Sequence, residues 1–376
     1  MYMAENWREI NWPKTVSEIH VHLGGSVPLY RLWEIAVEKG FRGLGGSYDE
    51  FLANLAIRSD RVRDLDSYLE VYDRIELIQS GPDAIRQSII IAIHRAYLTG
   101  GMAALGPGGE AGSGQPLFSI GKLELRFNPL KRTGAVFLKG RHAGLYDVDR
   151  VIKSACAAVE DVQIAFKGKI KIGLIFCFGR DMTHEANMIL AEKTSDWREH
   201  NDTIIGVDLA GPESVQPLSD QKALADMAAV FNKIGSQLGR TIHVGETPHV
   251  DIDTFLRTIE AINPHRVAHP IVALKAWWDK KDDRGLKLMK ERDLVCELCV
   301  KSNLLTGAVR DIKEYGRVIN TLDEFGIKYT FSTDAPSLQV TSLAEELILL
   351  LENGAATGEQ VLRALRVADE ESFIPQ

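Results

Sequence analysis

The chain has 376 residues, of which 45% are hydrophobic, and 44 Lys and Arg stand against 52 Asp and Glu for a formal net charge of −8. These fractions are typical of a soluble globular protein and exclude collagen-like and disordered classes, and no run has the roughly 18 consecutive apolar residues of a membrane helix. The acidic balance argues against a nucleic-acid partner, because phosphates favour basic surfaces. Four scattered cysteines and an N-terminus without a secretory pattern lead us to expect a reduced, cytoplasmic enzyme.

Short runs rich in Val, Ile, Leu and Phe recur along the chain, and helix-length stretches separate them. The runs are 18–23, 122–127, 171–178, 203–211, 240–246, 265–269, 294–300 and 328–334. Several are continuously apolar, as parallel strands covered by helices are. Eight alternations of strand and helix predict an α/β fold, a (β/α)8 TIM-type barrel in which residues 1–376 form one domain. An open doubly wound sheet has the same periodicity and is the alternative.

The interval between the first two runs, residues 24–121, is far longer than one crossover helix requires. Most of it has the pattern of amphipathic helices, which predicts a helical, lid-like insertion packed over one face of the barrel. Its last part, 106–116, is too rich in Gly, Ser and Pro for a helix or strand interior. We expect a surface loop there, and a mobile flap near the functional site is the alternative.

Two histidines, His20 and His22, stand two residues apart near the end of the first run. A strand has a side-chain period of two, so both imidazoles point to the same face, which in a barrel can be the interior. Neutral imidazole is a preferred zinc ligand, so the pair is a candidate metal site. A structural role for both histidines is the alternative.

Further histidines and carboxylates follow three other predicted strands. They are His243 and Glu246 after the fifth run, His269 at the end of the sixth and Asp334 at the end of the eighth. The chemistry of a (β/α)8 barrel is concentrated at the carboxyl ends of its strands. We therefore expect these side chains to converge with the first pair of histidines at one mouth of the barrel.

The motifs at these positions resemble those of one known family. In chain order they are EIHVHLGGS, LELRFNP, IIGVDLAGPE, HVGE, RVAH, ELCVKSN and STDAP, between residues 18 and 336. Each motif is weak alone, but the seven in this order resemble the adenosine deaminase family of the amidohydrolase superfamily. The resemblance covers most of the chain and implies a zinc-dependent (β/α)8 barrel that deaminates a purine.

The resemblance also implies a role for individual residues and one Zn²⁺ per chain. The implied zinc ligands are His20, His22, His243 and Asp334. Glu246 resembles the acid that protonates a ring nitrogen of the substrate. His269 resembles the residue that orients, or takes a proton from, the zinc-bound water. Gly211 resembles the backbone donor that meets another ring nitrogen in the purine pocket.

The chemistry of such a site is consistent with these roles. Zinc with one open position lowers the pKa of its bound water to about 7, and the water then attacks a ring carbon that bears an amino group. The adjacent ring nitrogen must gain a proton, which Glu246 is expected to supply as a general acid. His269 and Asp334 are expected to stabilise the developing charge while ammonia leaves.

Three functions are compatible with this site. The first is hydrolytic deamination of an aminopurine, such as adenosine or adenine, or of a related aminated heterocycle, including a nucleotide or a pterin. The second is another amidohydrolase reaction, such as cleavage of a cyclic amide. The third is a barrel without activity that serves as a binding protein. The expected partner is a small molecule, with neither nucleic acid nor membrane, and the sequence does not indicate an oligomeric state.

Four positions depart from the family pattern. Ala335 stands where a second acidic residue usually contacts the imidazole edge of the purine, and Gly24 stands where nucleoside deaminases carry an Asp for the ribose. Pro270 replaces a common Gly, and Val300 replaces a common Pro. If Ala335 faces the mouth, we expect adenosine to be a poor substrate and an Asp at this position to raise the activity toward adenosine.

Other polar residues near the strand ends have expected supporting roles. Asp208 is expected to orient a ligand, and Ser302 and Asn303 to brace the mouth. Glu124 and Arg126 share a face of the second strand and are expected to form a buried ion pair.

A basic cluster follows the second strand. It consists of Lys131, Arg132, Lys139, Arg141 and His142. Such a cluster is usually a solvated loop. Because it follows a strand end, the alternative is that it holds a phosphate or carboxylate of the substrate.

Overall fold

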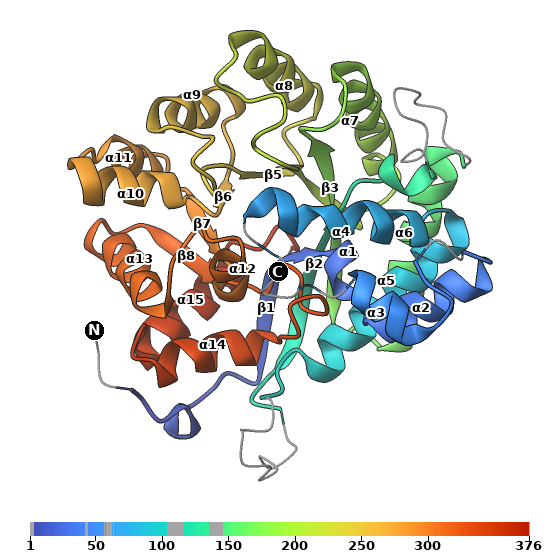
Figure 1. The fold of residues 1–376 in the computed structure, drawn as a ribbon, viewed down its shortest axis with the longest axis horizontal. Helices are drawn as coiled ribbons and strands as arrows, with labels where there is room; N and C mark the ends of the chain where they lie inside the picture. The colour runs from blue at the N-terminus through green and yellow to red at the C-terminus, as the bar shows by residue number, and fades with distance from the viewer. Residues whose placement is uncertain are drawn as a thin grey trace.

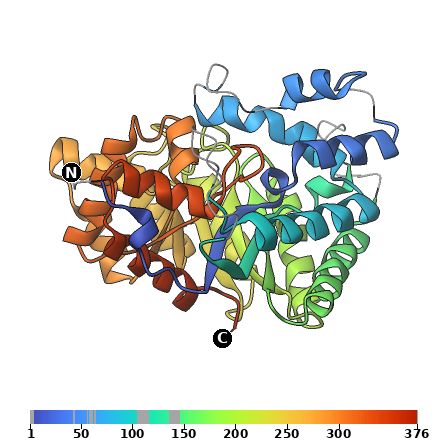
Figure 2. The same ribbon diagram turned by 90° about the horizontal axis from the view of Figure 1, so that it is seen from below.

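Eight parallel strands form the centre of the molecule (Figures 1 and 2). The computed structural model describes residues 4–41, 44–55, 57, 62, 64–103, 116–134 and 146–375. Each strand pairs with the next in the order β1 to β8, and an isolated bridge between Val21 and Asp334 connects the first strand to the end of the last. The predicted (β/α)8 barrel is therefore confirmed, and the open doubly wound sheet is excluded.

Each of the eight strands coincides with one predicted run. They are β1 Thr15–His22, β2 Ser119–Phe127, β3 Lys171–Gly179, β4 Ile204–Ala210, β5 Gly239–His243, β6 Arg266–Ala268, β7 Val295–Leu298 and β8 Lys328–Phe331. The later predicted runs extend beyond the carboxyl ends of their strands. Two of their last residues, His269 and Asp334, have φ angles of 52° and 62°. This left-handed conformation is incompatible with a strand, so the chain leaves the sheet there.

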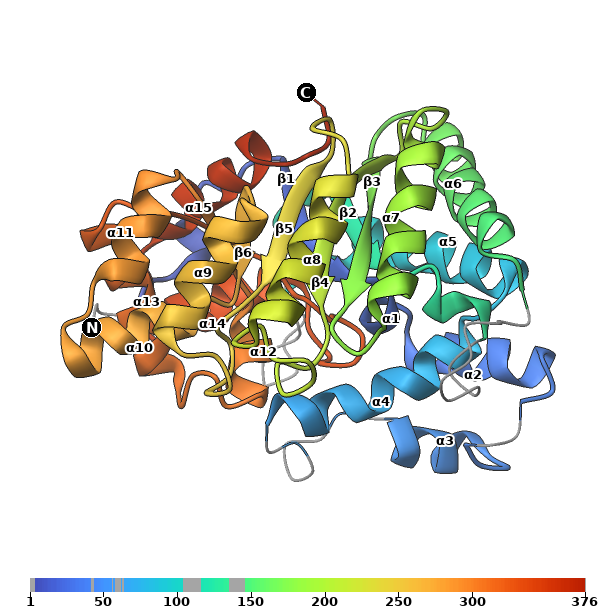
Figure 3. The same ribbon diagram turned by 90° about the horizontal axis from the view of Figure 1, so that it is seen from above.

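Helices surround the barrel and cover the strands (Figure 3). They are α6 Val148–Ala165, α7 His184–Arg198, α8 Gln221–Lys233, α9 Ile252–Ile262, α10 Ile271–Lys280, α11 Arg284–Glu291, α12 Val300–Leu305, α13 Ile312–Glu324, α14 Leu343–Glu352 and α15 Gly358–Glu370. Thr183, Asp251 and Ser342 cap helices by accepting a hydrogen bond from a backbone amide of the first turn. Among the helices of the described residues, none is long and apolar enough to cross a membrane.

Between β1 and β2, where the helical insertion was predicted, the described residues form five helices. They are α1 Leu23–Ser26, α2 Leu29–Glu38, α3 Tyr48–Leu55, α4 Leu65–Ile78 and α5 Pro82–Thr99. The second, third and fourth form an apolar cluster of their own, and Ala335 and Leu338, which follow β8, belong to this cluster. Figure 3 shows α2, α3 and α4 at one end of the barrel and α5 beside α6 in the outer ring. The glycine-rich loop lies almost wholly outside the described residues, so its expected role is untested.

A network of buried charges fills part of the barrel interior, and it corrects one expectation. Glu124 and Arg126 take different partners. The guanidinium of Arg126 lies 3.3 Å from Asp208 and 3.0 Å from Glu297, whereas Glu124 pairs with Arg266 at 2.5 Å. Residues two apart on one strand are separated by about 7 Å along the strand, so charges on other strands are closer.

Candidate active site

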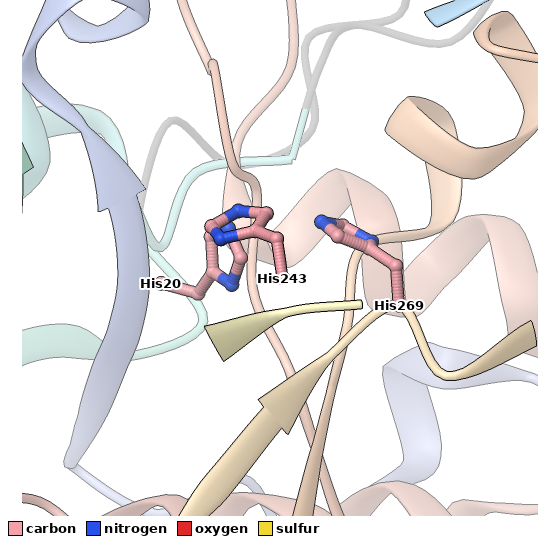
Figure 4. Close-up of side chains that lie close together, drawn as sticks. All are labelled: His20, His243 and His269. Atoms are coloured by element: carbon pink, nitrogen blue, oxygen red, sulfur yellow. The ribbon is translucent and has the colours of Figure 1, made fainter. Parts of the chain in front are cut away.

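A cavity of about 410 Å³ opens at the carboxyl ends of the strands, where the sequence places the site. Its lining includes six of the seven predicted site residues, namely His22, Gly211, His243, Glu246, His269 and Asp334. The seventh, His20, is fully buried. Figure 4 shows that the rings of His20, His243 and His269 converge from separate elements. The predicted site residues, from His20 to Asp334, therefore meet at one mouth of the barrel.

Four of these residues bring ring nitrogens and a carboxylate close together. Oδ1 of Asp334 lies 3.6 Å from Nε2 of His22 and 3.9 Å from Nε2 of His20. The Nε2 atoms of His22 and His243 are 3.2 Å apart. Nε2 of His20 is buried and has no hydrogen-bond partner among the residues that the structure describes. A cation would satisfy these facing lone pairs, so the donor set fits a metal ion.

Three further side chains fix the orientation of these donors. Nδ1 of His20 lies 2.6 Å from Glu297, and Nδ1 of His243 lies 3.1 Å from Asp208. A carboxylate accepts the proton of Nδ1, which leaves the lone pair on Nε2 for a metal. Ser302 donates a 2.6 Å hydrogen bond to Oδ2 of Asp334, so that Oδ1 faces the histidines. Asp208 and Ser302 thus lie where the sequence predicted them, whereas Glu297 was missed.

The electrostatic environment favours neutral imidazoles at His20 and His22. Burial, together with nearby positive groups, holds the pKa of both rings well below the usual value. Burial also acts against protonation of His243, but the carboxylate of Asp208 outweighs it and raises the pKa of that ring. Neutral imidazole is the form that binds metal ions.

Glu246 follows β5, is almost completely buried and lines the cavity together with the candidate metal ligands His22, His243 and Asp334. Burial, and then repulsion from Glu213, raises the pKa of its carboxyl group to about 7. Its Oε1 accepts hydrogen bonds from Thr306 at 2.9 Å and from Asn303 at 3.3 Å. Glu246 therefore retains a proton in a substantial fraction of molecules at neutral pH, as a general acid requires.

His269 lies at the end of β6, and α12 holds it in place. Nδ2 of Asn303 is 2.9 Å from Nδ1 of His269. Burial, and then the charge of His243, lowers the pKa of His269 to about 4, so the ring is neutral at pH 7. The Asn303 amide that donates to Glu246 also donates to Nδ1, so the neutral ring holds its proton on Nε2.

The backbone at Gly211 is held by a buried arginine that sequence reasoning missed. Gly211 follows β4 with a φ of 100°, a conformation that favours glycine. The guanidinium of Arg180 donates to the carbonyl oxygen of Gly211 at 3.4 Å and to that of His243. Arg180 thereby connects the ends of β4 and β5. The sequence offered little signal, because a single arginine after a strand is usually exposed.

Comparison with known proteins identifies the family. The family described as Adenosine deaminase matches residues 119–376. The chain belongs to the adenosine deaminase family. The adenosine deaminase of Clostridium acetobutylicum is 26% identical over 346 residues, which are 91% of this chain and 87% of that protein. The chain is therefore an enzyme that deaminates aminopurines by hydrolysis.

Two solved structures share the fold over almost the whole chain. An amidohydrolase from Burkholderia ambifaria with bound Zn has a TM-score of 0.76 and 15% identity, over 100% of this chain and 92% of that one. The N6-mAMP deaminase of Arabidopsis has a TM-score of 0.72 and 18% identity, over 96% and 95% of the two chains. At these identities the likeness shows the fold alone.

The structure corrects the expectation for Ala335, one departure from the adenosine deaminase pattern. Ala335 is fully buried and is not among the described residues that line the cavity. A Cβ atom on Gly25 would come within 2.3 Å of the Cβ of Ala335. The methyl group of Ala335 thus points toward Gly25 and the apolar cluster of the insertion, so it does not meet the substrate.

Replacing Ala335 by Asp is therefore expected to destabilise the protein and not to raise its activity toward adenosine. The new carboxylate would be buried against Gly25 without a partner, which typically costs at least about 2 kcal/mol. Urea unfolding and ammonia release from adenosine measure the two effects. Ala225→Asp, on the exposed side of α8, is the control and should change neither. A stable Ala335→Asp protein with higher adenosine activity would show that this residue reaches the cavity.

Proposed function

We propose that the chain is a zinc-dependent hydrolase. Its substrate is an uncharged aminopurine such as adenine or adenosine, which it converts into the corresponding oxopurine and ammonia. The observation that carries the proposal is the position of Glu246. Its protonatable carboxyl group lies in the same cavity as three of the four proposed metal ligands, His22, His243 and Asp334. A purine can be attacked at its amino-bearing carbon only if the neighbouring ring nitrogen is protonated. The cavity holds both groups that the reaction needs, a candidate metal site for the attacking water and a proton donor for the ring nitrogen.

The proposed metal is one Zn²⁺ per chain, held by His20, His22, His243 and Asp334. Three neutral imidazoles and one carboxylate are ligands that suit zinc. A zinc ion with an open position would lower the pKa of a coordinated water to about 7. All four donors come from one chain, which supports a stoichiometry of one.

The protein groups then have separate tasks. Glu246 donates its proton to the ring nitrogen beside the amino-bearing carbon, N1 of a purine. His269 donates its Nε2 proton to the oxygen of the attacking water and so orients this water. A ring that already carries a proton on Nε2 cannot take one from the water there, so we assign His269 the orienting role and not that of a base. The backbone of Gly211 meets another ring nitrogen from the β4 side. The water oxygen replaces the amino group. One proton of the water leaves with the amino group as ammonia, and the other restores the carboxyl group of Glu246.

We further propose that residues 1–376 act as one barrel domain and that the 24–121 insertion covers its mouth. Tyr68 and Tyr72 of α4 line the cavity together with the metal donors, which supports this arrangement. A small molecule is the proposed partner. The expected absence of nucleic-acid and membrane partners and the cytoplasmic location stay predictions.

The charges around the cavity favour an uncharged purine over a nucleotide. Lys131 and Arg132, two members of the basic cluster, already have acidic partners. Lys131 lies 2.6 Å from Asp181, and Arg132 lies 2.9 Å from Glu76. The other three members lie outside the described residues. Further acidic residues line the cavity, namely Asp66, Glu70 and Asp73. A phosphate would meet this negative surface, and like charges repel it.

A substrate panel tests the proposal. We expect conversion of adenine or adenosine with a kcat/KM at least about tenfold above that of AMP or N6-methyl-AMP, because a 1.4 kcal/mol penalty for the phosphate corresponds to this factor. Chromatography of the products and ammonia release are the measurements, with a pterin and a cyclic amide in the same panel. The preference should shrink at high salt, which screens exposed charges. A preference for the nucleotides would refute the charge argument. Turnover of the cyclic amide alone would identify the other amidohydrolase reaction.

A further inference from the structure

Tyr72 of the insertion lies directly beside the metal donors. It lines the cavity together with His22 and Asp334. A Cβ atom on Gly24 would approach the ring carbons Cδ1 and Cε1 of Tyr72 to 3.0 and 3.1 Å, and a Cβ on Gly25 would lie 3.1 Å from its hydroxyl oxygen. The ring thus covers the two glycines that follow His22. A side chain at position 24 would therefore push the ring of Tyr72 outward, by a few tenths of an ångström for a Cβ atom alone.

The surroundings of Tyr72 leave its hydroxyl proton available to the cavity. Nε2 of Gln339 donates a 2.8 Å hydrogen bond to the hydroxyl oxygen of Tyr68, and this hydroxyl faces that of Tyr72 at 3.5 Å. Either phenol can be the donor in this contact, and when the O–H of Tyr68 is directed to the Tyr72 oxygen, the O–H of Tyr72 is free for the cavity. Burial raises the pKa of both phenols well above the usual value, so both remain donors at neutral pH.

Asp334 and Glu76 are the two carboxylates of the cavity that act electrostatically on the phenol of Tyr72, and in the described part of the chain neither forms a hydrogen bond with it. Ser302 donates to Oδ2, while Oδ1 faces the nitrogens of His20 and His22. Within the described residues, the hydroxyl of Tyr72 thus has the hydroxyl of Tyr68, 3.5 Å away, as its one hydrogen-bond partner, and an acceptor on a ligand in the cavity can take its proton.

The order of the strands determines which edge of a purine faces Tyr72. Glu246 follows β5, whereas Gly24 and Asp334 follow β1 and β8, on the opposite side of the closed barrel. With N1 at Glu246 and the amino-bearing carbon at the metal donors, the imidazole edge points away from Glu246. It therefore points toward β1 and β8, where the ring of Tyr72 lies beside Gly24 and the hydroxyl of Tyr68 binds Gln339. Figure 3 shows α4, which carries both tyrosines, at this end of the barrel.

We propose that the hydroxyl group of Tyr72 donates a hydrogen bond to N7 on the imidazole edge of the bound purine. The proposal rests on the proposed function. N7 of a purine substituted at N9 carries a lone pair and no hydrogen, so its recognition needs a donor, which the phenol supplies. The insertion thereby contributes a specificity-determining contact that neither Gly24 nor Ala335 can make.

Matched ligand pairs that differ only at N7 test this contact. The probes are hypoxanthine with 7-deazahypoxanthine and inosine with 7-deazainosine, measured as competitive inhibitors of deamination. The deaza ring has a C–H at position 7, which accepts no hydrogen bond. We expect the wild-type protein to bind the N7 compound roughly three- to tenfold more tightly, the range for one neutral hydrogen bond. In Tyr72→Phe this ratio should fall to about one, with a rise in KM larger than any fall in kcat.

Two more variants complete the experiment. Tyr30→Phe, an exposed tyrosine of α2, should keep the wild-type ratio. Gly24→Ala should shift the Tyr72 ring by a few tenths of an ångström and reduce the ratio less than Tyr72→Phe does. An unchanged N7 preference in a folded Tyr72→Phe protein would overturn the proposal and leave Tyr72 as a packing residue. If no aminopurine is deaminated and none of the four probes binds, the proposed function fails and the Tyr72 contact fails with it.

Discussion

Glu246→Gln is expected to lower kcat by at least about a hundredfold, the low end for the loss of a general acid. The amide has the shape of the carboxyl group and can still accept the hydrogen bonds from Thr306 and Asn303. It cannot release a proton to the ring nitrogen of the purine. The fold and the metal content should therefore stay unchanged while ammonia release is lost.

Steady-state ammonia release from the best aminopurine of the panel measures this loss, and metal analysis and thermal unfolding test the other two expectations. Glu260→Gln is a matched control, because Glu260 is exposed on α9 outside the cavity. Its turnover should equal that of the wild-type protein. Near-normal turnover in Glu246→Gln would assign the protonation step to another group.

The sequence was sufficient to predict the barrel because its signal is local. Strands covered by helices are continuously apolar, and each of the eight predicted runs overlaps a strand. The ligand candidates were also readable, because His20 and His22 share a face and His243 and Asp334 follow strands that end at the same mouth. Periodicity and strand order together were enough to place residues more than 300 positions apart.

The supporting contacts could not be predicted from the same signals, because they depend on register across the barrel. Glu297 contacts His20 across 277 residues, and the side chain of Arg180 crosses from β3 to the ends of β4 and β5. The sequence spacing around Glu297 and Arg180 does not predict which residues they contact. The error at Ala335 has a related cause. Adjacency to Asp334 suggested the cavity, but a φ of 62° at Asp334 turns the chain, and the next side chain points to Gly25.

The same reasoning applies to Glu124 and Arg126. Alternation on one strand predicts that two side chains share a face, and both residues are indeed buried. It does not predict which charges from other strands lie nearer. Arg266 reaches Glu124, and Asp208 and Glu297 reach Arg126, because neighbouring strands bring them closer than the next inward position of the same strand.

His20→Ala and His243→Ala are each expected to abolish stable zinc binding. Each removes one of four proposed ligands, and the remaining three no longer enclose the ion. Atomic absorption after dialysis should find one zinc per chain in the wild-type protein and none in either variant. His200→Ala removes an exposed histidine at the end of α7 and is the control, so it should retain its zinc.

Asp208→Asn tests the orientation of the ligand His243 and separates it from ligation itself. The carboxylate of Asp208 holds Nδ1 of His243 at 3.1 Å, and its loss should weaken zinc binding by about ten- to a hundredfold without removing a ligand. Competition with a chelator measures the affinity, and thermal unfolding controls for the lost contact with Arg126. The expected order of zinc affinity is therefore wild type, then Asp208→Asn, then His243→Ala. Full zinc occupancy in His20→Ala or His243→Ala would place the metal site elsewhere, and an unchanged affinity in Asp208→Asn would remove Asp208 from the orientation of His243.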